Sequence, residues 1–309
     1  MMSDTYGTAP MDYRLPAQTH TGTVRLQVSD LVRSLAFYEG LLGLRVISRD
    51  ADTARLGAAA DALPLLELRA GADPHPARRA RLGLYHFAVL LPDRSSLGSL
   101  LAHLLARGVQ PGAADHLVSE ALYLQDPDDL GIELYCDRPR ATWTTRGREL
   151  VMATDPLDGA GLSAAADGAT WNGMPTGTTI GHVHLHVGDI AAARSFYHDA
   201  LGFDIVVSTY PGALFLSAGG YHHHLGLNTW AGAHAVAPAE NEPRLLSWDL
   251  VMPSADDVAA AAHSLARHGY AVSPEEVGGS VAHDPWQTPL RLVVAPREPS
   301  LTRSEEHTS

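Results

Sequence analysis

One pattern occurs twice in this 309-residue chain, and it constrains the fold more than any other feature of the sequence. The stretch TVRLQVSDLVRSLAFYEGLLGLRVI contains an alternating strand, Asp30 as the N-cap of an amphipathic helix, Gly43 as its stop, and another strand. The stretch IGHVHLHVGDIAAARSFYHDALGFDIV, from Ile180, repeats this order. Six residues recur 159 positions later: Val28/Val187, Asp30/Asp189, Phe37/Phe196, Tyr38/Tyr197, Leu42/Leu201 and Gly43/Gly202. The duplication predicts two structurally related halves.

A weaker repeat divides each half again. LYHFAVLLPDRSSLGSLLAHLLARG, from Leu84, and LLSWDLVMPSADDVAAAAHSLARHG, from Leu245, each predict a strand, a turn and a helix that ends at glycine. The chain therefore contains four strand-helix-strands modules, at residues 21–71, 82–138, 179–230 and 244–296.

The remaining residues fall outside the repeat. We expect residues 1–20 to form a loose arm, and the Thr-, Gly- and Ala-rich residues 139–178 to link a first domain, 21–138, to a second, 179–296. Residues 297–309 end in RSEEHTS, which resembles a translated sequencing adapter, so we expect the native C-terminus to differ.

Composition disfavours several classes of protein. The hydrophobic content of 45% and charged content of 18% are typical of a globular protein, and the formal net charge of −13 disfavours nucleic acid and anionic membranes as partners. Because the sequence has no long apolar run and no signal-peptide core, we expect a cytoplasmic protein. Cys136 is the only cysteine, so no disulfide can form within the chain. Histidine is abundant, at 17 residues, and only position can select candidate ligands among them.

The segment ADHLVSEALYLQDPDDLGIELY, residues 114–135, carries several groups that can hold or serve a metal. They are His116, Tyr123 and Glu133. The intervening QDPDDLG predicts a tight turn, so Tyr123 and Glu133 lie on neighbouring strands. Glu133 stands in the apolar run GIELY, a setting that disfavours a merely solvated carboxylate.

The repeated phrase D-L-x-x-S-x-x-F-Y-x-x-x-L-G resembles that of the vicinal oxygen chelate superfamily, which includes glyoxalases, antibiotic-resistance proteins and extradiol dioxygenases. The resemblance covers most of residues 21–296. It implies an α+β fold, in which four βαβββ modules form two cup-shaped, incomplete β-barrels with the helices outside.

The segment 114–135 is also similar to the fingerprint of the extradiol ring-cleavage dioxygenases. The matching elements are His116, Leu122-Tyr123, Asp126-Pro127 and Glu133. Two positions depart from the fingerprint, because Ala114 replaces a Gly, Asn, Thr, Ile or Val, and Asp129 replaces the turn Gly or Pro. The loop could therefore bend differently, although Glu133 keeps its spacing.

In this superfamily the metal ligands occupy equivalent places on the first and last strands of a module. The first-strand place is occupied, in chain order, by Thr23, His86, His182 and Ser247. The last-strand place is occupied by Glu67, Glu133, His224 and Arg291. The resemblance therefore implies one metal site of His86, His182 and Glu133, built by pairing modules two and three, while modules one and four pair as a scaffold. This two-histidine, one-carboxylate set suits Fe(II) or Mn(II), whereas zinc or nickel would be the glyoxalase-like choice.

Other histidines and Tyr123 have roles that the resemblance leaves open. His184 and His186 share a strand face with His182, but one residue alone usually reaches a given metal. His224 matches an acid–base histidine of extradiol enzymes, or a fourth ligand of the glyoxalase type, or it is simply a polar residue at the sheet rim. His116 and Tyr123 match groups that donate hydrogen bonds to developing oxygen charge, with a loop histidine and a core tyrosine as the alternatives.

An aromatic substrate would also need an apolar wall. The candidates are Phe87, Trp230 and Trp248, each of which could equally belong to the hydrophobic core.

The resemblance implies the activity of a four-module catechol 2,3-dioxygenase of the extradiol type. The partners would be a small aromatic diol and O2, bound at a non-haem Fe(II), and the product a 2-hydroxymuconic semialdehyde. A metal-dependent glyoxalase-type isomerase or thiol transferase is the first alternative, and a non-catalytic drug-binding protein is the second. A homo-oligomer remains open, because paired-module proteins commonly self-associate.

Overall fold

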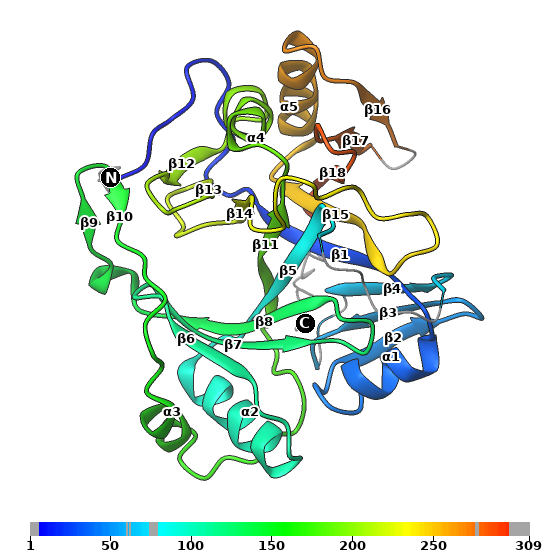
Figure 1. Cartoon of the computed structure of the whole chain (residues 1–309), viewed down its shortest axis with the longest axis vertical. Helices are drawn as coiled ribbons and strands as arrows, with labels where there is room; N and C mark the ends of the chain where they lie inside the picture. The colour runs from blue at the N-terminus through cyan, green and yellow to red at the C-terminus, as the bar shows by residue number, and fades with distance from the viewer. Residues whose placement is uncertain (1–5, 60, 62, 74–79, 276–277, 297–309) are drawn as a thin grey trace, which may run out of the picture.

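The computed structural model describes residues 6–59, 61, 63–73, 80–275 and 278–296 (Figure 1). The prediction for residues 297–309 therefore lies outside the described residues. Each module contains one strand, one helix and three further strands, which confirms the predicted βαβββ order.

The first two modules are consecutive in the chain. Module one consists of β1 (His20–Val28), α1 (Leu31–Tyr38), β2 (Arg45–Arg49), β3 (Thr53–Gly57) and β4 (Leu66–Ala70). Module two consists of β5 (Gly83–Leu90), α2 (Arg94–Ala106), β6 (Gly112–Asp115), β7 (Ser119–Gln125) and β8 (Gly131–Asp137).

The second half of the chain repeats this plan. Module three consists of β11 (Thr179–His186), α4 (Ile190–Arg194), the π-helical turn η2 (Ser195–Ala200), β12 (Asp204–Val207), β13 (Ala213–Ser217) and β14 (Leu225–Asn228). Module four consists of β15 (Arg244–Met252), α5 (Ala255–Arg267), β16 (Val272–Pro274), β17 (Ser280–His283) and β18 (Pro289–Val294).

The four modules form two curled eight-stranded sheets. One sheet has the order β12-β13-β14-β11-β5-β8-β7-β6 and joins modules three and two, and the other has the order β16-β17-β18-β15-β1-β4-β3-β2 and joins modules four and one. We call them the inner cup and the outer cup, after the place of their modules in the chain. At the centre of each cup the first strands of two modules pair antiparallel, as β5 with β11 and β1 with β15. The module pairing predicted from the distribution of ligands is confirmed.

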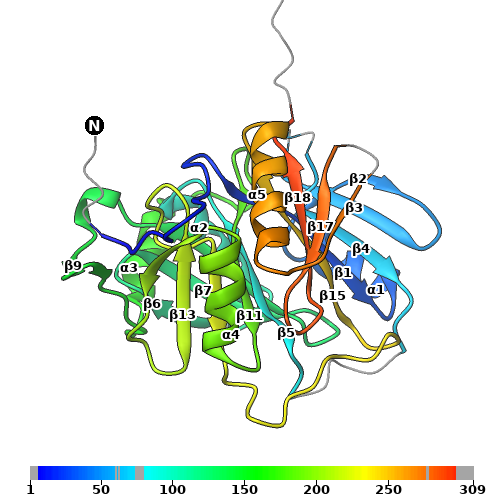
Figure 2. The ribbon, with the colours of Figure 1, turned by 90° about the horizontal axis from the view of Figure 1, so that it is seen from above.

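Local sequence explains where the helices begin. The N-caps Asp30, Asp93, Asp189 and Ser254 each accept a hydrogen bond from a backbone N–H in the first helical turn. The helices lie outside the sheets, as Figure 2 shows for α5 beside β17 and β18. Apolar residues from all four modules form one continuous core. In the part of the chain that the structure describes, no helix is both long and apolar enough to span a membrane.

The segment 139–178 is more than the expected linker. It contains η1 (Arg140–Thr142), the hairpin β9 (Thr145–Arg146) and β10 (Glu149–Leu150), and α3 (Gly159–Ala165), which packs on α2. The arm also differs from the expectation of a loose segment. Residues 6–19 lie against module three, where Leu15 is buried and Arg14 forms an ion pair with Asp204.

Candidate metal centre and substrate cavity

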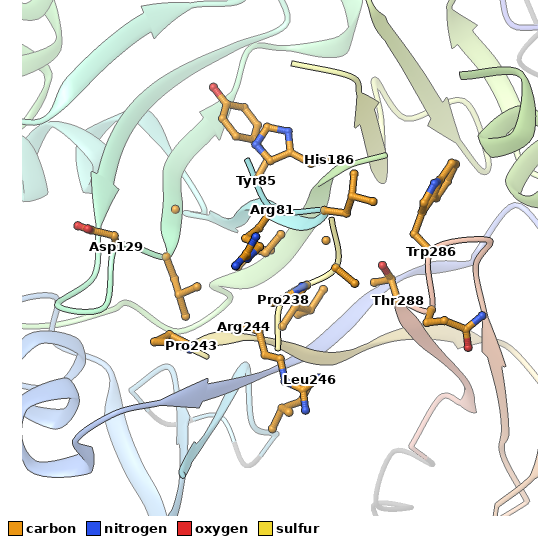
Figure 3. A pocket seen from close by; sticks show the side chains of 18 of the residues that line it. Arg81, Tyr85, Asp129, His186, Pro238, Pro243, Arg244, Leu246, Trp286 and Thr288 are labelled. Atoms are coloured by element: carbon orange, nitrogen blue, oxygen red, sulfur yellow. The ribbon is translucent and has the colours of Figure 1, made fainter. Parts of the chain in front are cut away.

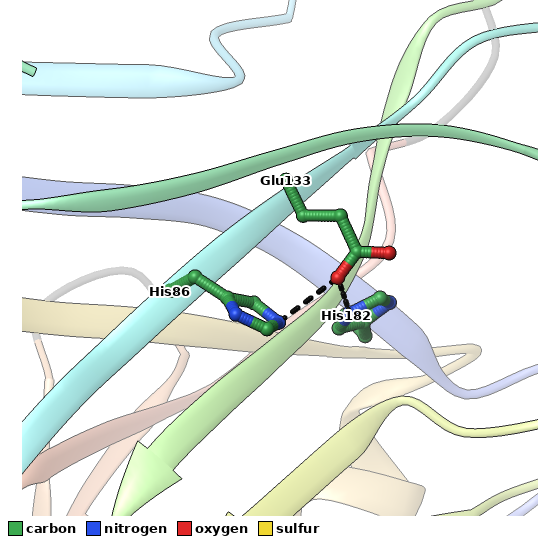
Figure 4. Close-up of side chains that lie close together, drawn as sticks. All are labelled: His86, Glu133 and His182. Carbon is green, nitrogen blue, oxygen red and sulfur yellow. Dashed lines mark hydrogen bonds and ion pairs between the residues drawn. The ribbon is translucent and has the colours of Figure 1, made fainter. Parts of the chain in front are cut away.

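Three predicted ligands converge in the inner cup. His86 on β5, His182 on β11 and Glu133 on β8 point toward one another from three adjacent strands (Figure 4). Glu133 Oε2 lies 3.0 Å from His86 Nε2 and 3.2 Å from His182 Nε2, and the candidate ligand atoms all lie within 4.8 Å of one another. All three side chains are buried.

Strand register explains this convergence. Ala88 on β5 pairs with His182 on one side and with Glu133 on the other, and His86 precedes Ala88 on the same face. Because Ala88 carries only a methyl group, the three longer side chains can meet above it. A larger residue at position 88 would occupy the space between the ligands.

The donor set fits a divalent metal. His86 Nε2 is buried and, although it lies 3.0 Å from Glu133 Oε2, it makes no well-aligned hydrogen bond within the described residues, so a coordination bond would satisfy it. Burial lowers the pKa of His182 to about 4. Burial alone would raise the pKa of Glu133, but His182 and His86 outweigh it and hold that pKa well below its usual value. Neutral imidazole and carboxylate are the protonation states that metal binding requires.

A cavity of about 280 Å³ opens beside these ligands. This volume is near the lower end of the range of about 300–1,000 Å³ for ligand pockets, which suits a small single-ring molecule. Most lining residues come from modules two and three, but some come from the segment 139–178. The lining residues are Tyr85, His86, Ala113, Ala114, His116, Tyr123, Glu133, Met152, Ala153, Thr154, His184, Tyr210, Phe215, His223 and Trp230.

His116 and Tyr123, both predicted as site residues, form a pair on the cavity wall. His116 Nδ1 lies 2.6 Å from the carbonyl oxygen of Ala153 and therefore donates to it, which leaves Nε2 as an acceptor in the neutral ring. The Tyr123 hydroxyl, 2.5 Å away, then donates to His116 Nε2. Burial and the neighbouring Glu133 raise the pKa of Tyr123 well above its usual value, so the hydroxyl keeps its proton.

The structure corrects the assignment of His224. This side chain does not line the cavity, because its Nδ1 accepts a hydrogen bond from the Ala218 N–H and its ring packs on Tyr221. The preceding residue, His223, lines the cavity instead, and its ring centroid lies 4.1 Å from that of His182. The sequence placed His224 at the last-strand position of module three, but β14 begins only at Leu225, so strand alternation does not extend to these histidines.

His184 is a further cavity residue that position alone did not select. Its Nε2 lies 2.9 Å from the side-chain nitrogen of Asn228, which donates to it, so His184 is an acceptor there rather than a free ligand. The ring lies directly over Gly226, where an added Cβ would come within 2.7 Å of the imidazole. Burial lowers the pKa of His184 well below its usual value and keeps the ring neutral.

Only one of the three aromatic residues predicted to line the substrate cavity does so. Trp230 lines the cavity and packs edge-on against Tyr85. Phe87 does not line the cavity, because strand alternation turns it to the face opposite His86, where it packs near Tyr38. Trp248 is fully buried on β15 of the outer cup. The last two are core residues, and Phe215 and Tyr210 line the cavity in their place.

A second cavity, of about 530 Å³, is larger but contains none of the three candidate ligands. It lies between the two cups, where Tyr85 and His186 stand on one side and Arg244 and Trp286 on the other (Figure 3). Tyr85 lines both cavities and separates them. We place the chemistry in the smaller cavity, because it holds the metal-ligating groups.

The outer cup carries ion pairs at the corresponding place. Arg25 lies opposite Ser247, as His184 lies opposite His86, and it binds Asp249 at 2.5 Å. Arg291, the counterpart of Glu133, lies 3.3 Å from the same Asp249 and also pairs with Glu275. A paired cation at this place disfavours a divalent metal in the outer cup.

Comparison with protein families now gives the class of protein. Residues 19–134 and 179–284 match the family model described as Glyoxalase/Bleomycin resistance protein/Dioxygenase superfamily. The chain belongs to this superfamily.

Individual proteins of known sequence or structure also resemble this chain. The chain is 45% identical over 263 residues to catechol-2,3-dioxygenase of Bacillus subtilis (strain 168), which covers 84% of this chain and 91% of the relative. Among solved structures, a putative dioxygenase from Bacillus subtilis subsp. subtilis str. 168 matches with a TM-score of 0.62 at 14% identity, covering 92% of this chain and 87% of that chain. Glyoxalase I from Zea mays matches with a TM-score of 0.53 at 18% identity, covering 89% and 92%. These two structures support the fold alone.

Proposed function

We propose that the chain is an extradiol ring-cleaving dioxygenase that converts a catechol and O2 to a 2-hydroxymuconic semialdehyde-type product. The observation that carries the proposal is the cluster of His86, His182 and Glu133 beside a small aromatic-lined cavity. The 45% identity to a catechol-2,3-dioxygenase over most of both chains supports the same reaction. A cytoplasmic location belongs to the proposal as well.

The cluster would hold Fe(II), with Mn(II) as the alternative. Two histidines and one carboxylate leave open coordination positions, where the bound metal would bring the diol and O2 together. The face of the cluster that opens to the cavity is the side from which a diol can approach.

The cavity residues then act on the substrate itself. His223 replaces His224 as the base, because its imidazole reaches the cavity and burial keeps it neutral by lowering its pKa well below the usual value. A neutral imidazole can take one phenolic proton and return it later to the opening ring. Tyr123 gives its one hydroxyl hydrogen to His116 in this structure, so it would donate to oxygen charge that develops during the reaction by exchanging that bond for one to the substrate.

Aromatic side chains complete the site by enclosing the ring. The aromatic lining residues are Trp230, Phe215 and Tyr210. The Tyr210 hydroxyl lies 3.1 Å from the hydroxyl of Thr154, which also lines the cavity. Such a wall favours a flat apolar ring and excludes water from it.

The alternatives lose support from the same geometry. A glyoxalase-type isomerase or thiol transferase was favoured by His224 as a fourth ligand, but His224 is turned away and bonded to the backbone. A drug-binding protein without a metal has no need for a buried carboxylate between two buried imidazoles.

Oxygen uptake tests the proposal directly. After anaerobic loading with Fe(II), the parent chain should consume O2 with catechol and form a yellow ring-cleavage product. Glu133→Ala should abolish both, whereas Glu67→Ala, at the equivalent place in module one, should retain both. No uptake with several catechols, while Glu133→Ala still abolishes tight metal binding, would overturn the dioxygenase and favour an isomerase or transferase.

A further inference from the structure

A chain of hydrogen bonds runs from the protein surface to the cavity. It begins at Asp137, the last residue of β8, whose side chain is 30% exposed. Asp137 Oδ1 lies 2.9 Å from Nε2 of His222, which is fully buried. His222 Nδ1 lies 2.7 Å from Nδ1 of His223, and the His223 ring lines the cavity.

The donor and acceptor properties of these atoms determine which nitrogen of each imidazole carries hydrogen. An ionised carboxylate only accepts hydrogen bonds, so His222 Nε2 must donate to Asp137. Tyr221 donates to the same carboxylate oxygen, at 3.1 Å, which agrees with its role as an acceptor. A neutral His222 then has a lone pair on Nδ1, and His223 donates to it through Nδ1–H, whereas a doubly protonated His222 would donate instead and give His223 the opposite tautomer. With His222 neutral, His223 Nε2 therefore has no hydrogen and presents a lone pair.

The surroundings of His222 keep this order in place. Its ring lies between Tyr221 and Trp143, with centroid distances of 4.1 and 5.4 Å, so it cannot turn without displacing them. Gly219 and Gly220, both with positive φ, form the bend that leads the chain to His222 and His223. His223 Nε2 forms no hydrogen bond with the described part of the chain, so it is free to meet a ligand.

We propose that Asp137 and His222 are positioning residues that hold His223 in the tautomer with hydrogen on Nδ1 and a lone pair on Nε2 toward the cavity. Only this tautomer can accept a proton from a substrate hydroxyl at Nε2, because the opposite tautomer would present N–H to O–H. The catalytic meaning rests on the proposed function, but the tautomer itself does not.

Nitrogen NMR of the histidine rings tests the tautomer without any activity measurement. The full chain is labelled with ¹⁵N, treated with chelator, and measured alone and with diamagnetic Zn(II). The His223 signals are assigned as those lost in His223→Gln. We expect a protonated Nδ1 and a bare Nε2 in the parent, and fractional protonation of both nitrogens in Asp137→Ala. Hydrogen on Nε2 in the parent, or an unchanged tautomer in Asp137→Ala, would overturn the proposal.

Variants of His222 and Tyr221 extend this experiment. His222→Phe removes the middle of the chain and should also release the His223 tautomer, and His222→Leu, which has no donor or acceptor, serves the same purpose if the phenylalanine does not fold. Tyr221→Phe is the matched control, since it removes one hydrogen bond to Asp137 but leaves the two bonds of the chain intact. The His223 tautomer should be the same in Tyr221→Phe as in the parent, and its loss there would overturn the assignment to His222.

Kinetics then test the positioning role. In Asp137→Ala, kcat should fall by about 100-fold, the lower range for general acid–base catalysis, while KM and metal affinity change much less. Asp137→Glu should recover part of the rate, whereas Asp137→Asn should not, because its amide N–H₂ can donate to His222 and reverse both bonds. If both nitrogens of His223 are fractionally protonated in Asp137→Ala but kcat does not fall, the positioning role is overturned. Absence of oxygen uptake in the parent would overturn the proposed function and leave the NMR result standing.

Discussion

The hydroxyl of Tyr38 donates a 2.9 Å hydrogen bond to Asp126, and both groups are buried. Tyr38 ends α1 of the outer cup, whereas Asp126 begins the turn after β7 of the inner cup. The equivalent residues of the second half, Tyr197 and Asp284, form the same bond at 3.0 Å. The recurrent Phe-Tyr and Asp-Pro pairs of the sequence therefore join one cup to the other.

Removing either hydroxyl should destabilise the protein. We expect Tyr38→Phe and Tyr197→Phe each to lower the free energy of unfolding by about 1–3 kcal/mol, because a buried carboxylate loses a donor. The two bonds share no residue, so the double variant should show roughly the sum. Urea denaturation measures both values. Tyr13→Phe, whose hydroxyl bond is 3.4 Å long and half-buried, is the control, and an equal loss there would contradict the idea.

Asp126 should also make stability depend on pH. Burial raises the pKa of Asp126 from its usual value of 3.8 to about 6, so the folded state binds a proton more tightly than the unfolded state. The resulting stabilisation is complete below about pH 4 and is lost as the pH rises through 6. Relative to Asp126→Asn, the parent should lose about 3 kcal/mol over this window. A difference between the two urea midpoints that is constant from pH 4 to 7 would refute this.

The turn at Asp129 carries local strain that a glycine would relieve. Asp129 is exposed and has a φ of 62°, and Gln287, its counterpart in module four, has a φ of 67°. Asp129→Gly should raise the free energy of unfolding by about 0.5 kcal/mol, and Asp129→Ala should lower it by about 1 kcal/mol, since alanine lacks both the carboxylate and the freedom of glycine. Thermal unfolding of the three proteins should rank them glycine, aspartate, alanine.

Metal should stabilise the chain through Glu133. At a free concentration 100-fold above the dissociation constant, Fe(II) or Mn(II) should add about 2.7 kcal/mol to the free energy of unfolding. A chelator should remove this gain. Glu133→Gln should remove it as well, but Glu67→Gln, at the equivalent place in the outer cup, should not. Equal stabilisation of both variants would place the metal elsewhere.

Trp230 should affect substrate binding, and Trp248 should not. Trp230→Ala removes an aromatic wall of the cavity and should raise KM for catechol by about 10-fold, which corresponds to about 1.4 kcal/mol. Trp248→Phe changes only a buried core residue, so it should alter stability and leave KM unchanged. Steady-state oxygen uptake distinguishes the two, and an increased KM in Trp248→Phe would contradict the cavity assignment.

Much of this architecture could be predicted from the sequence, because it rests on regular spacing. The duplication identified the modules, and the equivalent place on the first strand of each module selected His86 and His182, which lie within regular strands. The ligand distribution also predicted which modules pair, as the sheet order confirms. The role of the three ligands in metal binding stays a prediction.

The incorrect or missing predictions concern residues outside the regular strands, or residues to which strand alternation was not applied. His223 and His224 lie in a bend outside β14, and the position expected from related sequences gave His224 instead of His223. Phe87 could have been excluded, since alternation turns it away from His86. The lining residues Met152, Ala153 and Thr154 have no counterpart in the repeat, and no periodic signal could have identified them.

The pairing of the modules is nested, with the second and third inside the first and fourth, and this sets an order for synthesis. When Asn228 has emerged from the ribosome, every strand of the inner cup is available, but β1 still lacks its neighbour β15. At about 5–20 residues per second, the missing strand follows within seconds. The nascent chain can therefore assemble the three candidate ligands before its ends meet, and until then the edge of β1 that will pair with β15 remains open to chaperones.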